Sequence, residues 1–182
     1  NKIVKVDLSI VGDVSDVIRS TTKTLKNKNL NLGKSNKQKI SKWWQQIQKW
    51  RTKQSLNFIN SDKIIKPQHA VQRLYELTKN QDTFITTEVG QHQMWAAQHY
   101  KLNKPNRWMT SGGLGTMGYG LPAAIGVQVA NPTKLVVDVA GEASILMTMQ
   151  EISTAIQYNL PIKIFILNNQ YMGMVRQWQE LL

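Results

Sequence analysis

The sequence contains no cysteine, and none of its 182 residues lie in an apolar run long enough to span a membrane. Without cysteine the chain forms no disulfide, ligates no iron–sulfur cluster and offers no thiol nucleophile. A membrane-spanning helix needs about 20 consecutive apolar residues, so we expect no membrane partner. A basic-then-apolar signal segment is also missing after Asn1. We therefore expect a cytoplasmic location and an internal piece of a longer protein.

Acidic residues are scarce: 11 Asp and Glu face 23 Lys and Arg, which gives a net charge of +12. The excess is confined to residues 19–66, where thirteen basic residues accompany a single acid, Asp62. Residues 1–18 hold two Lys and three Asp, and residues 67–182 hold eight basic and seven acidic residues. A charge excess restricted to one polar stretch indicates a solvated segment rather than a basic domain, so we expect no nucleic-acid partner.

Proline, methionine and most glycines are missing from the first third of the chain. All five Pro lie at or beyond Pro67, all seven Met beyond residue 93, and nine of eleven Gly beyond residue 89. This change in composition predicts a boundary near residues 60–67. We interpret residues 19–66 as a basic, partly helical linker and residues 67–182 as a domain of their own.

Inside the basic stretch, tryptophan and isoleucine recur at helical spacing and predict an amphipathic helix over about 40–53. Its apolar side chains are Ile40, Trp43, Trp44, Ile47 and Trp50. The favoured interpretation is a linker helix that lays its Trp face on a neighbouring domain. A patch for nucleic acid or an anionic membrane is the alternative, but no recognised nucleic-acid motif accompanies it.

Residues 2–8 alternate between apolar and polar side chains, and a short helix pattern begins at Val14. This predicts a strand followed by a helix. We interpret residues 1–18 as the C-terminal end of a central α/β domain.

From residue 67 onward, helical patterns alternate with short apolar runs. We expect helices over 68–79, 93–100, about 120–130 and about 145–158, and strands over 83–87, 135–139 and 162–167. Apolar strands that alternate with helices predict an α/β fold, in which a parallel sheet is covered by helices on both faces.

Two polar side chains follow neighbouring strands of this predicted sheet. Glu142 comes after the strand 135–139, and Asn169 comes after the strand 162–167. Ligands of open parallel sheets bind beyond the carboxyl ends of the strands, and carboxylate and amide oxygens suit Mg²⁺. Ser144 lies at a predicted helix N-terminus, where free N–H groups favour a phosphate. Together these residues predict a magnesium-dependent diphosphate site.

Four blocks then occur in a specific order along the chain. They are Glu88–Gln98, Arg107–Gly118 with Leu121–Gly126, Gly141–Ser144 with Asn168–Asn169, and Gly173–Trp178. The third block resembles the thiamine-diphosphate motif usually written GD(G/A)S…NN. As a set, the blocks resemble the catalytic large subunits of acetolactate synthase (acetohydroxyacid synthase). The resemblance is close over residues 67–182, loose over 1–18 and weak over 19–66.

The resemblance implies thiamine diphosphate and Mg²⁺ as cofactors. Glu142, Asn169 and the backbone carbonyl of Tyr171 would hold the metal, and Gln91 and His92 would contact the diphosphate. The full set of implied cofactor-binding residues is Val89, Gly90, Gln91, His92, Gly115, Met117, Gly141, Glu142, Ala143, Ser144, Asn169, Tyr171, Met172, Gly173 and Met174.

Three further roles come with the resemblance. Met117 would lie under the bend of the cofactor and enforce its V shape, Met174 would pack on the pyrimidine side, and Trp178 would lie at the substrate entrance. The resemblance also implies that the glutamate that activates the cofactor would lie outside this chain, in a partner subunit, and that FAD would bind mostly outside it. One position departs from the family pattern: Glu142 replaces the usual Asp. Its extra methylene shifts the carboxylate by about 1.5 Å, whereas Mg²⁺ holds its ligands near ~2.0–2.1 Å.

The implied reaction is decarboxylation of pyruvate and carboligation to a second 2-ketoacid, pyruvate or 2-oxobutyrate. Its products, acetolactate and acetohydroxybutyrate, belong to branched-chain amino acid biosynthesis. The implied partners are further copies of the complete chain, as a homodimer or tetramer, and a small regulatory subunit. Two alternatives remain: another thiamine-diphosphate-dependent decarboxylase, oxidase or carboligase, and a non-catalytic anion-binding module.

Overall fold

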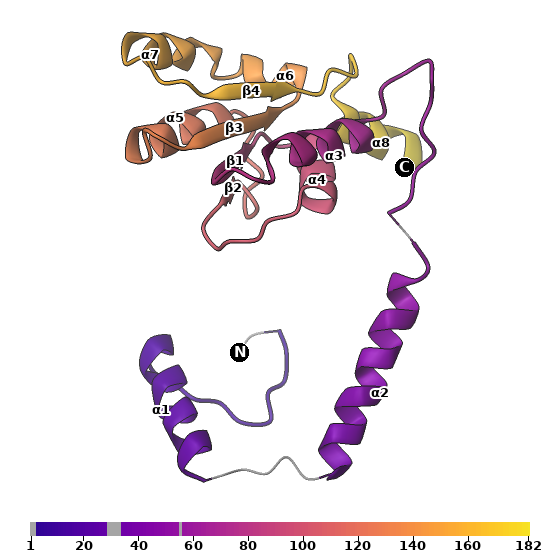
Figure 1. Ribbon diagram of the computed structural model, residues 1–182, viewed down its shortest axis with the longest axis vertical. Coiled ribbons are helices and arrows are strands. Elements are labelled where there is room, and N and C mark those ends of the chain that lie inside the picture. Colours follow the sequence, from indigo (N-terminus) through magenta and orange to yellow (C-terminus); the bar gives the residue numbers. More distant parts are fainter. Residues whose placement is uncertain (1–2, 29–33, 55) are drawn as a thin grey trace. The chain divides into compact units, whose positions relative to one another are not determined.

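The computed structural model describes residues 3–28, 34–54 and 56–182 (Figure 1). The chain divides into two units, residues 1–55 and 56–182. The division therefore falls within the basic stretch 19–66. Among the described residues, no helix is both long enough and apolar enough to cross a membrane.

The described residues of the first unit form two helices, α1 (Val14–Asn27) and α2 (Lys34–Arg51). Asp13 caps α1, because its carboxylate accepts the N–H groups of Ser15 and Asp16 at 2.9 and 3.2 Å. The strand expected over residues 2–8 is wrong for residues 3–8, which form none, and residue 2 lies outside the described residues. A strand needs a ladder of hydrogen bonds to a neighbouring strand, and the described residues of this unit contain no strand.

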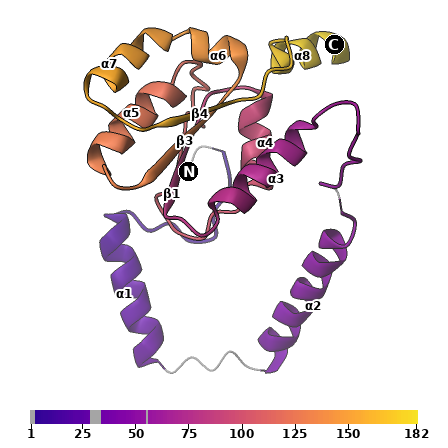
Figure 2. The same cartoon turned by 45° about the horizontal axis from the view of Figure 1, so that its top comes forward.

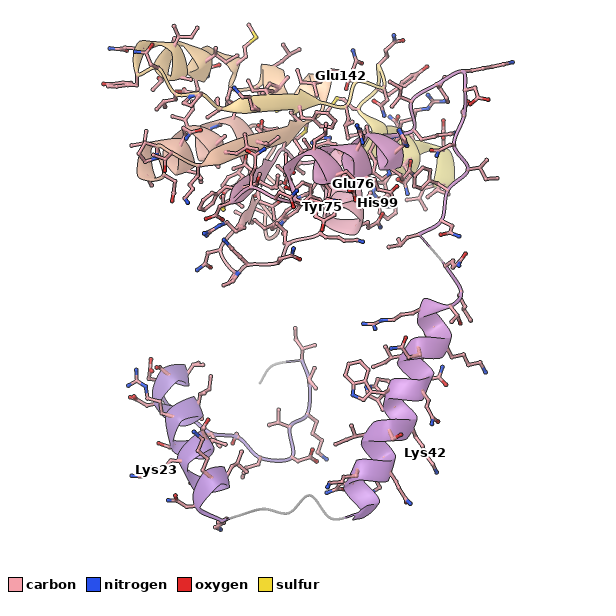
Figure 3. The ribbon with its side chains drawn as sticks, in the orientation of Figure 1. Lys23, Lys42, Tyr75, Glu76, His99 and Glu142 are labelled. Carbon is pink, nitrogen blue, oxygen red and sulfur yellow. The ribbon has the colours of Figure 1, made fainter. Side chains whose placement is uncertain are left out.

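Helix α2 carries the tryptophan stripe predicted from the sequence. The rings of Trp43 and Trp50 meet edge to face, with centroids 5.4 Å apart. About half of the surface of Trp43, Trp44 and Trp50 is exposed. The basic side chain of Lys42 on the same helix is also exposed (Figure 3). The docking of this face on a neighbouring domain stays a prediction.

The second unit is built on four parallel strands in the order β2-β1-β3-β4. They are β1 (Thr83–Thr87), β2 (Trp108–Thr110), β3 (Leu135–Ala140) and β4 (Lys163–Ile166). The expected α/β fold with a parallel sheet is confirmed. Strand β2 was not anticipated.

Helices cover both faces of this sheet (Figures 1 and 2). One face packs against α3 (Pro67–Thr78) and α4 (Gln91–His99), and the other against α5 (Gly120–Ala130), α6 (Glu142–Leu146) and α7 (Ile152–Gln157). The alternation of side chains along a strand explains the two cores. Val137 and Val139 of β3 join the α3–α4 core, whereas Val136 and Ala140 join the cores on the α5 side.

The single helix expected over 145–158 is wrong. The chain forms α6, then a 3-10 helix over Met149–Glu151, and then α7. The break occurs at Thr148, whose backbone leaves helical geometry (φ −135°, ψ 20°) and whose hydroxyl donates to the carbonyl of Gly118 at 3.1 Å. This tertiary hydrogen bond carries no local sequence signal. A last helix, α8 (Gly173–Leu181), was also not anticipated.

Candidate functional site

The site lies where the strand order reverses. Strand β1 is flanked by β2 on one side and β3 on the other, so the segments that follow β1 and β3 leave the sheet in different directions. Such a switch point opens a crevice at the carboxyl edge of a parallel sheet. Residues 88–90 follow β1, and residues 141–142 follow β3.

A pocket occupies this crevice. Its lining residues are Val89, Gly90, Gln91, His92, Trp95, Met117, Gly141, Glu142, Ala143, Ser144, Leu167, Asn169, Tyr171, Met172, Gly173, Met174 and Val175. Segments that are up to 86 residues apart in sequence therefore meet at one place, as the hydrogen bond from Gln91 to Gln177 also shows. All but one of the residues named above as cofactor-binding lie in this pocket.

His92 fills the floor of the crevice. Its side chain is buried, and the buried Nε2 has no hydrogen-bond partner among the described residues. Burial lowers the pKa of His92 to about 4, although a backbone hydrogen bond with Glu88 and the charge of Glu142 act in the opposite direction. The imidazole is therefore neutral near pH 7, and no described residue forms a hydrogen bond with its Nε2.

Two glycines give the imidazole its space. A Cβ atom at Gly141 would lie 2.8 Å from Nδ1 of His92, and one at Gly90 would lie 2.7 Å from its Cε1. Gly90 also has φ +155°, a conformation that side chains disfavour. Positions 90 and 141 must therefore be glycine for the His92 ring to fit between the two segments that follow β1 and β3.

Glu142 begins α6, directly after the turn that follows β3 (Figure 3). One of its carboxylate oxygens, Oε1, is buried and has no hydrogen-bond partner among the described residues. Asn169 follows β4 and lines the same pocket, where its Oδ1 accepts the N–H of Tyr171 at 3.2 Å. Glu142, Asn169 and Tyr171 thus line the same pocket.

Ser144 uses its hydroxyl locally. The group accepts the N–H of Gly141 at 3.2 Å and donates to the carbonyl of Gly141 at 3.1 Å. The side chain is almost fully buried. Ser144 therefore closes the turn that presents Glu142 to the pocket.

Helix α8 approaches the pocket through its first residue. A Cβ atom at Gly173 would overlap the Gln91 amide and lie 2.9 Å from Nδ2 of Asn169. The Gln91 amide also donates to Oε1 of Gln177 on α8, at 3.1 Å. Gly173 is thus required for this helix to begin beside the two polar side chains.

Two of the residues singled out from the sequence do not line the pocket. Gly115 lies in an exposed turn with φ +65°, where a Cβ atom would come 3.8 Å from Cγ1 of Val89. Trp178 lies on α8 with 60% of its surface exposed. In turn, sequence reasoning missed Trp95, Leu167 and Val175. The sequence could have predicted Trp95, because this residue lies one helical turn after Gln91 and therefore on the same face of α4.

The pocket suits a divalent cation that carries an anionic group. Glu142 supplies a buried carboxylate oxygen without a partner, and Asn169 supplies an amide oxygen. Hard cations such as Mg²⁺ prefer these ligands and complete their shell with water or phosphate oxygens. The described residues contain no cluster of three or more His, Asp or Glu side chains.

Comparison with known protein families supports the same interpretation. Residues 88–182 match the family model described as "Thiamine pyrophosphate enzyme, C-terminal TPP binding domain", which is more than half of the chain. Thiamine pyrophosphate is another name for thiamine diphosphate. The chain belongs to the thiamine pyrophosphate enzymes.

Within this family, the chain is similar in sequence to acetolactate synthase large subunits. The chain is 47% identical over 182 residues to the acetolactate synthase isozyme 3 large subunit of Escherichia coli, and 44% identical over 182 residues to the acetolactate synthase large subunit of Haemophilus influenzae. It is 47% identical over 173 residues, 95% of its length, to acetolactate synthase 1, chloroplastic, of Nicotiana tabacum. The resemblance to acetolactate synthase large subunits is therefore confirmed.

The two bacterial alignments cover 100% of the chain but only 31% of each relative, and the tobacco alignment covers 25% of that protein. The chain thus spans about a third of the length of the bacterial relatives. The bacterial alignments also include residues 1–66, where the sequence motifs gave only a loose or weak resemblance.

Proposed function

We propose that this chain binds the diphosphate half of thiamine diphosphate through Mg²⁺, as part of an acetolactate synthase. The observation that carries the proposal is the buried, unpartnered Oε1 of Glu142, in a pocket that Asn169 and His92 also line. Leaving a buried carboxylate oxygen without a partner is costly. A cation at this position would remove that cost.

In this proposal Glu142, Asn169 and the carbonyl of Tyr171 hold the metal, and Gln91 and the neutral imidazole of His92 hold the diphosphate. Thiamine diphosphate, when bound, supplies the electron sink that permits decarboxylation and carbon–carbon bond formation. The chain contributes position: Met117 supports the bend of the cofactor, and Met174 packs against its pyrimidine side.

The substrates proposed are pyruvate and a second 2-ketoacid, pyruvate or 2-oxobutyrate, with Trp178 at their entrance. Further proposals from the same family likeness are a homodimer or tetramer of complete chains, a regulatory subunit, FAD bound mostly by residues outside this chain, and a cytoplasmic location. The activating glutamate is proposed to come from a partner subunit.

Another thiamine-diphosphate enzyme of 2-ketoacids is the nearest alternative. The identity to acetolactate synthase large subunits and the block Gly173–Trp178 favour acetolactate synthase. Product analysis separates the two, because a decarboxylase releases an aldehyde whereas the proposed enzyme releases acetolactate.

The test is a chimera in which this chain replaces the matched 31% of the Escherichia coli subunit. Supplied with pyruvate, thiamine diphosphate and Mg²⁺, the chimera should form acetolactate. The 182-residue chain alone should not, because general acid–base assistance by the absent glutamate is worth about 10²–10⁴-fold. Acetaldehyde as the main product of the chimera would favour the alternative enzyme.

A further inference from the structure

Glu88 is the first residue after β1, and its side chain is completely buried. Its Oε2 accepts the N–H of Gly118 at 2.6 Å, and its Oε1 accepts the N–H of Leu121 at 3.1 Å. Charge-assisted hydrogen bonds of this kind are about twice as strong as neutral ones. Glu88 therefore ties the strand end that leads into residues 89–92 to a loop 30 residues further along the chain.

Gly118 is held on its other side as well. Its carbonyl accepts the hydroxyl of Thr148 at 3.1 Å, and its backbone has φ +87°. A Cβ atom at Gly118 would lie 3.0 Å from Cγ2 of Thr148. The residue just before this fixed glycine is Met117, which lines the pocket. The path of the backbone at Met117 is thus set by Glu88 and Thr148.

A second buried carboxyl group lies beside this link. Asp138 is fully buried and accepts the hydroxyl of Thr86 at 2.9 Å. Burial raises the pKa of both acids, to about 7 for Asp138, where the charge of Glu88 adds to the effect. At Glu88, hydrogen bonds from the backbone N–H groups of residues 118–121 lower the pKa and so oppose the effect of burial. Both oxygens of the Glu88 carboxyl group accept backbone N–H groups, which favours its charged form, whereas Asp138 accepts a single hydroxyl.

We propose that Glu88 is a positioning residue for the cofactor: by fixing the Gly118 peptide, its carboxylate holds Met117 against the thiamine part. The inference rests on the proposed function. The diphosphate part would be held by other residues, among them Gln91, His92 and Glu142. Loss of the Glu88 link should therefore affect the two parts of the cofactor differently.

The experiment is a calorimetric titration of the 182-residue chain with thiamine diphosphate and, separately, with inorganic pyrophosphate, both with Mg²⁺. Glu88→Gln should weaken thiamine diphosphate about tenfold, which corresponds to ~1.4 kcal/mol, and leave pyrophosphate within about twofold. Glu76→Gln is the matched control, because Glu76 is an exposed acid on α3 paired with Lys79 (Figure 3). It should change neither affinity.

A double-mutant cycle tests whether Glu88 acts through Met117. If it does, adding Glu88→Gln to Met117→Ala should weaken thiamine diphosphate no further. A further tenfold loss in the double variant would overturn the proposal, as would equal losses for both ligands in Glu88→Gln. A wild-type chain that binds neither ligand would contradict the proposed function itself, and the role of Glu88 would fall with it.

If Glu88→Gln does not fold, amide hydrogen exchange of the wild-type chain tests whether Glu88 fixes the Gly118 peptide. The amides of Gly118 and Leu121 should be protected, and that of Gly118 should exchange more slowly still with thiamine diphosphate bound. Exchange of the Gly118 amide at the rate of an open loop, with or without the cofactor, would overturn the proposal.

Discussion

Thr86 and Asp138 face each other on neighbouring strands, and the Thr86 hydroxyl donates to Asp138 Oδ1 at 2.9 Å. Both residues are completely buried. The other carboxyl oxygen of Asp138, Oδ2, is buried without a hydrogen-bond partner among the described residues. The sheet thus carries an acid in its interior whose charged form is poorly solvated, and this raises its pKa to about 7.

This acid should make stability depend on pH. Between its ordinary pKa of 3.8 and its folded value of about 7, the folded chain keeps a proton that the unfolded chain has released. The contribution of Asp138 to the free energy of unfolding should therefore fall as pH rises through this window, by at most ~1.4 kcal/mol per unit. The lowered pKa of His92 acts in the opposite direction between about 4 and 6.5, so the effect of Asp138 is read from a variant. Asp138→Asn keeps the shape and removes this titration, so the stability of the variant relative to the wild-type chain should rise with pH across the window. Urea unfolding from pH 4.5 to 8 measures both slopes, and equal slopes would contradict the expectation.

A pair of glycines in α5 offers a matched test of packing. A Cβ atom at Gly120 would lie 2.7 Å from the backbone N of Glu88 and would overlap Asp138, whereas one at Gly126 would have no atom within 4 Å. Gly120→Ala should destabilise the chain by about 1–3 kcal/mol or more. Gly126→Ala should be neutral or stabilise it by up to ~1 kcal/mol. Thermal unfolding compares the two, and equal effects would argue against this close approach.

Much of the second unit could be predicted from its sequence, because the buried strands of a parallel sheet are short segments rich in apolar and β-branched residues. The strand 83–87 has the bounds of β1, and the strand 135–139 falls one residue short of β3. Strand β2 was not predicted from the sequence, because it has only three residues and is half-buried at the edge of the sheet. The strand expected over residues 2–8 failed for a different reason: alternating side chains form a strand only beside another strand, and the described residues of the first unit contain none.

The candidate site was predictable where it is built from a linear motif. The residues from Val89 to His92 and from Gly141 to Ser144 follow strands directly, and they line one pocket. The links that hold the site together were not predictable. The hydrogen bond between the Gly118 N–H and Glu88 joins residues that are 30 positions apart, and so does the one between the Thr148 hydroxyl and the Gly118 carbonyl. No local sequence pattern at Glu88 or Thr148 indicates that these hydrogen bonds form.

Metal-dependent cofactor binding should depend on the carboxylate at position 142. Glu142→Gln removes the charge and should weaken thiamine diphosphate about tenfold or more at fixed Mg²⁺, since a neutral amide is a poorer ligand for a hard cation. Glu142→Asp restores the family's usual residue and should keep most of the affinity. Cofactor titration of the chain measures both. Unchanged affinity in Glu142→Gln would show that the residue serves only as a first-turn acid of α6.

The charge of the basic stretch should be dispensable for catalysis. Lys23, Lys26, Lys42 and Lys49 lie exposed on α1 and α2, and isolated surface charges contribute little. Replacing all four with Gln in the acetolactate synthase chimera should leave turnover within about threefold. A hundredfold loss would mean that this stretch contacts something essential, and would favour an interaction module.

The most direct test of the metal-dependent site is the anomalous signal of Mn²⁺ in crystals of the chain grown with thiamine diphosphate and Mn²⁺ in place of Mg²⁺. We expect one strong peak in the crevice beyond β3 and β4, bound by Asn169, the carbonyl of Tyr171 and the diphosphate. Glu142 should reach it directly, at about 2.0–2.3 Å, or through one water. A diphosphate and metal bound elsewhere, or a Glu142 carboxylate turned away from the metal, would contradict it.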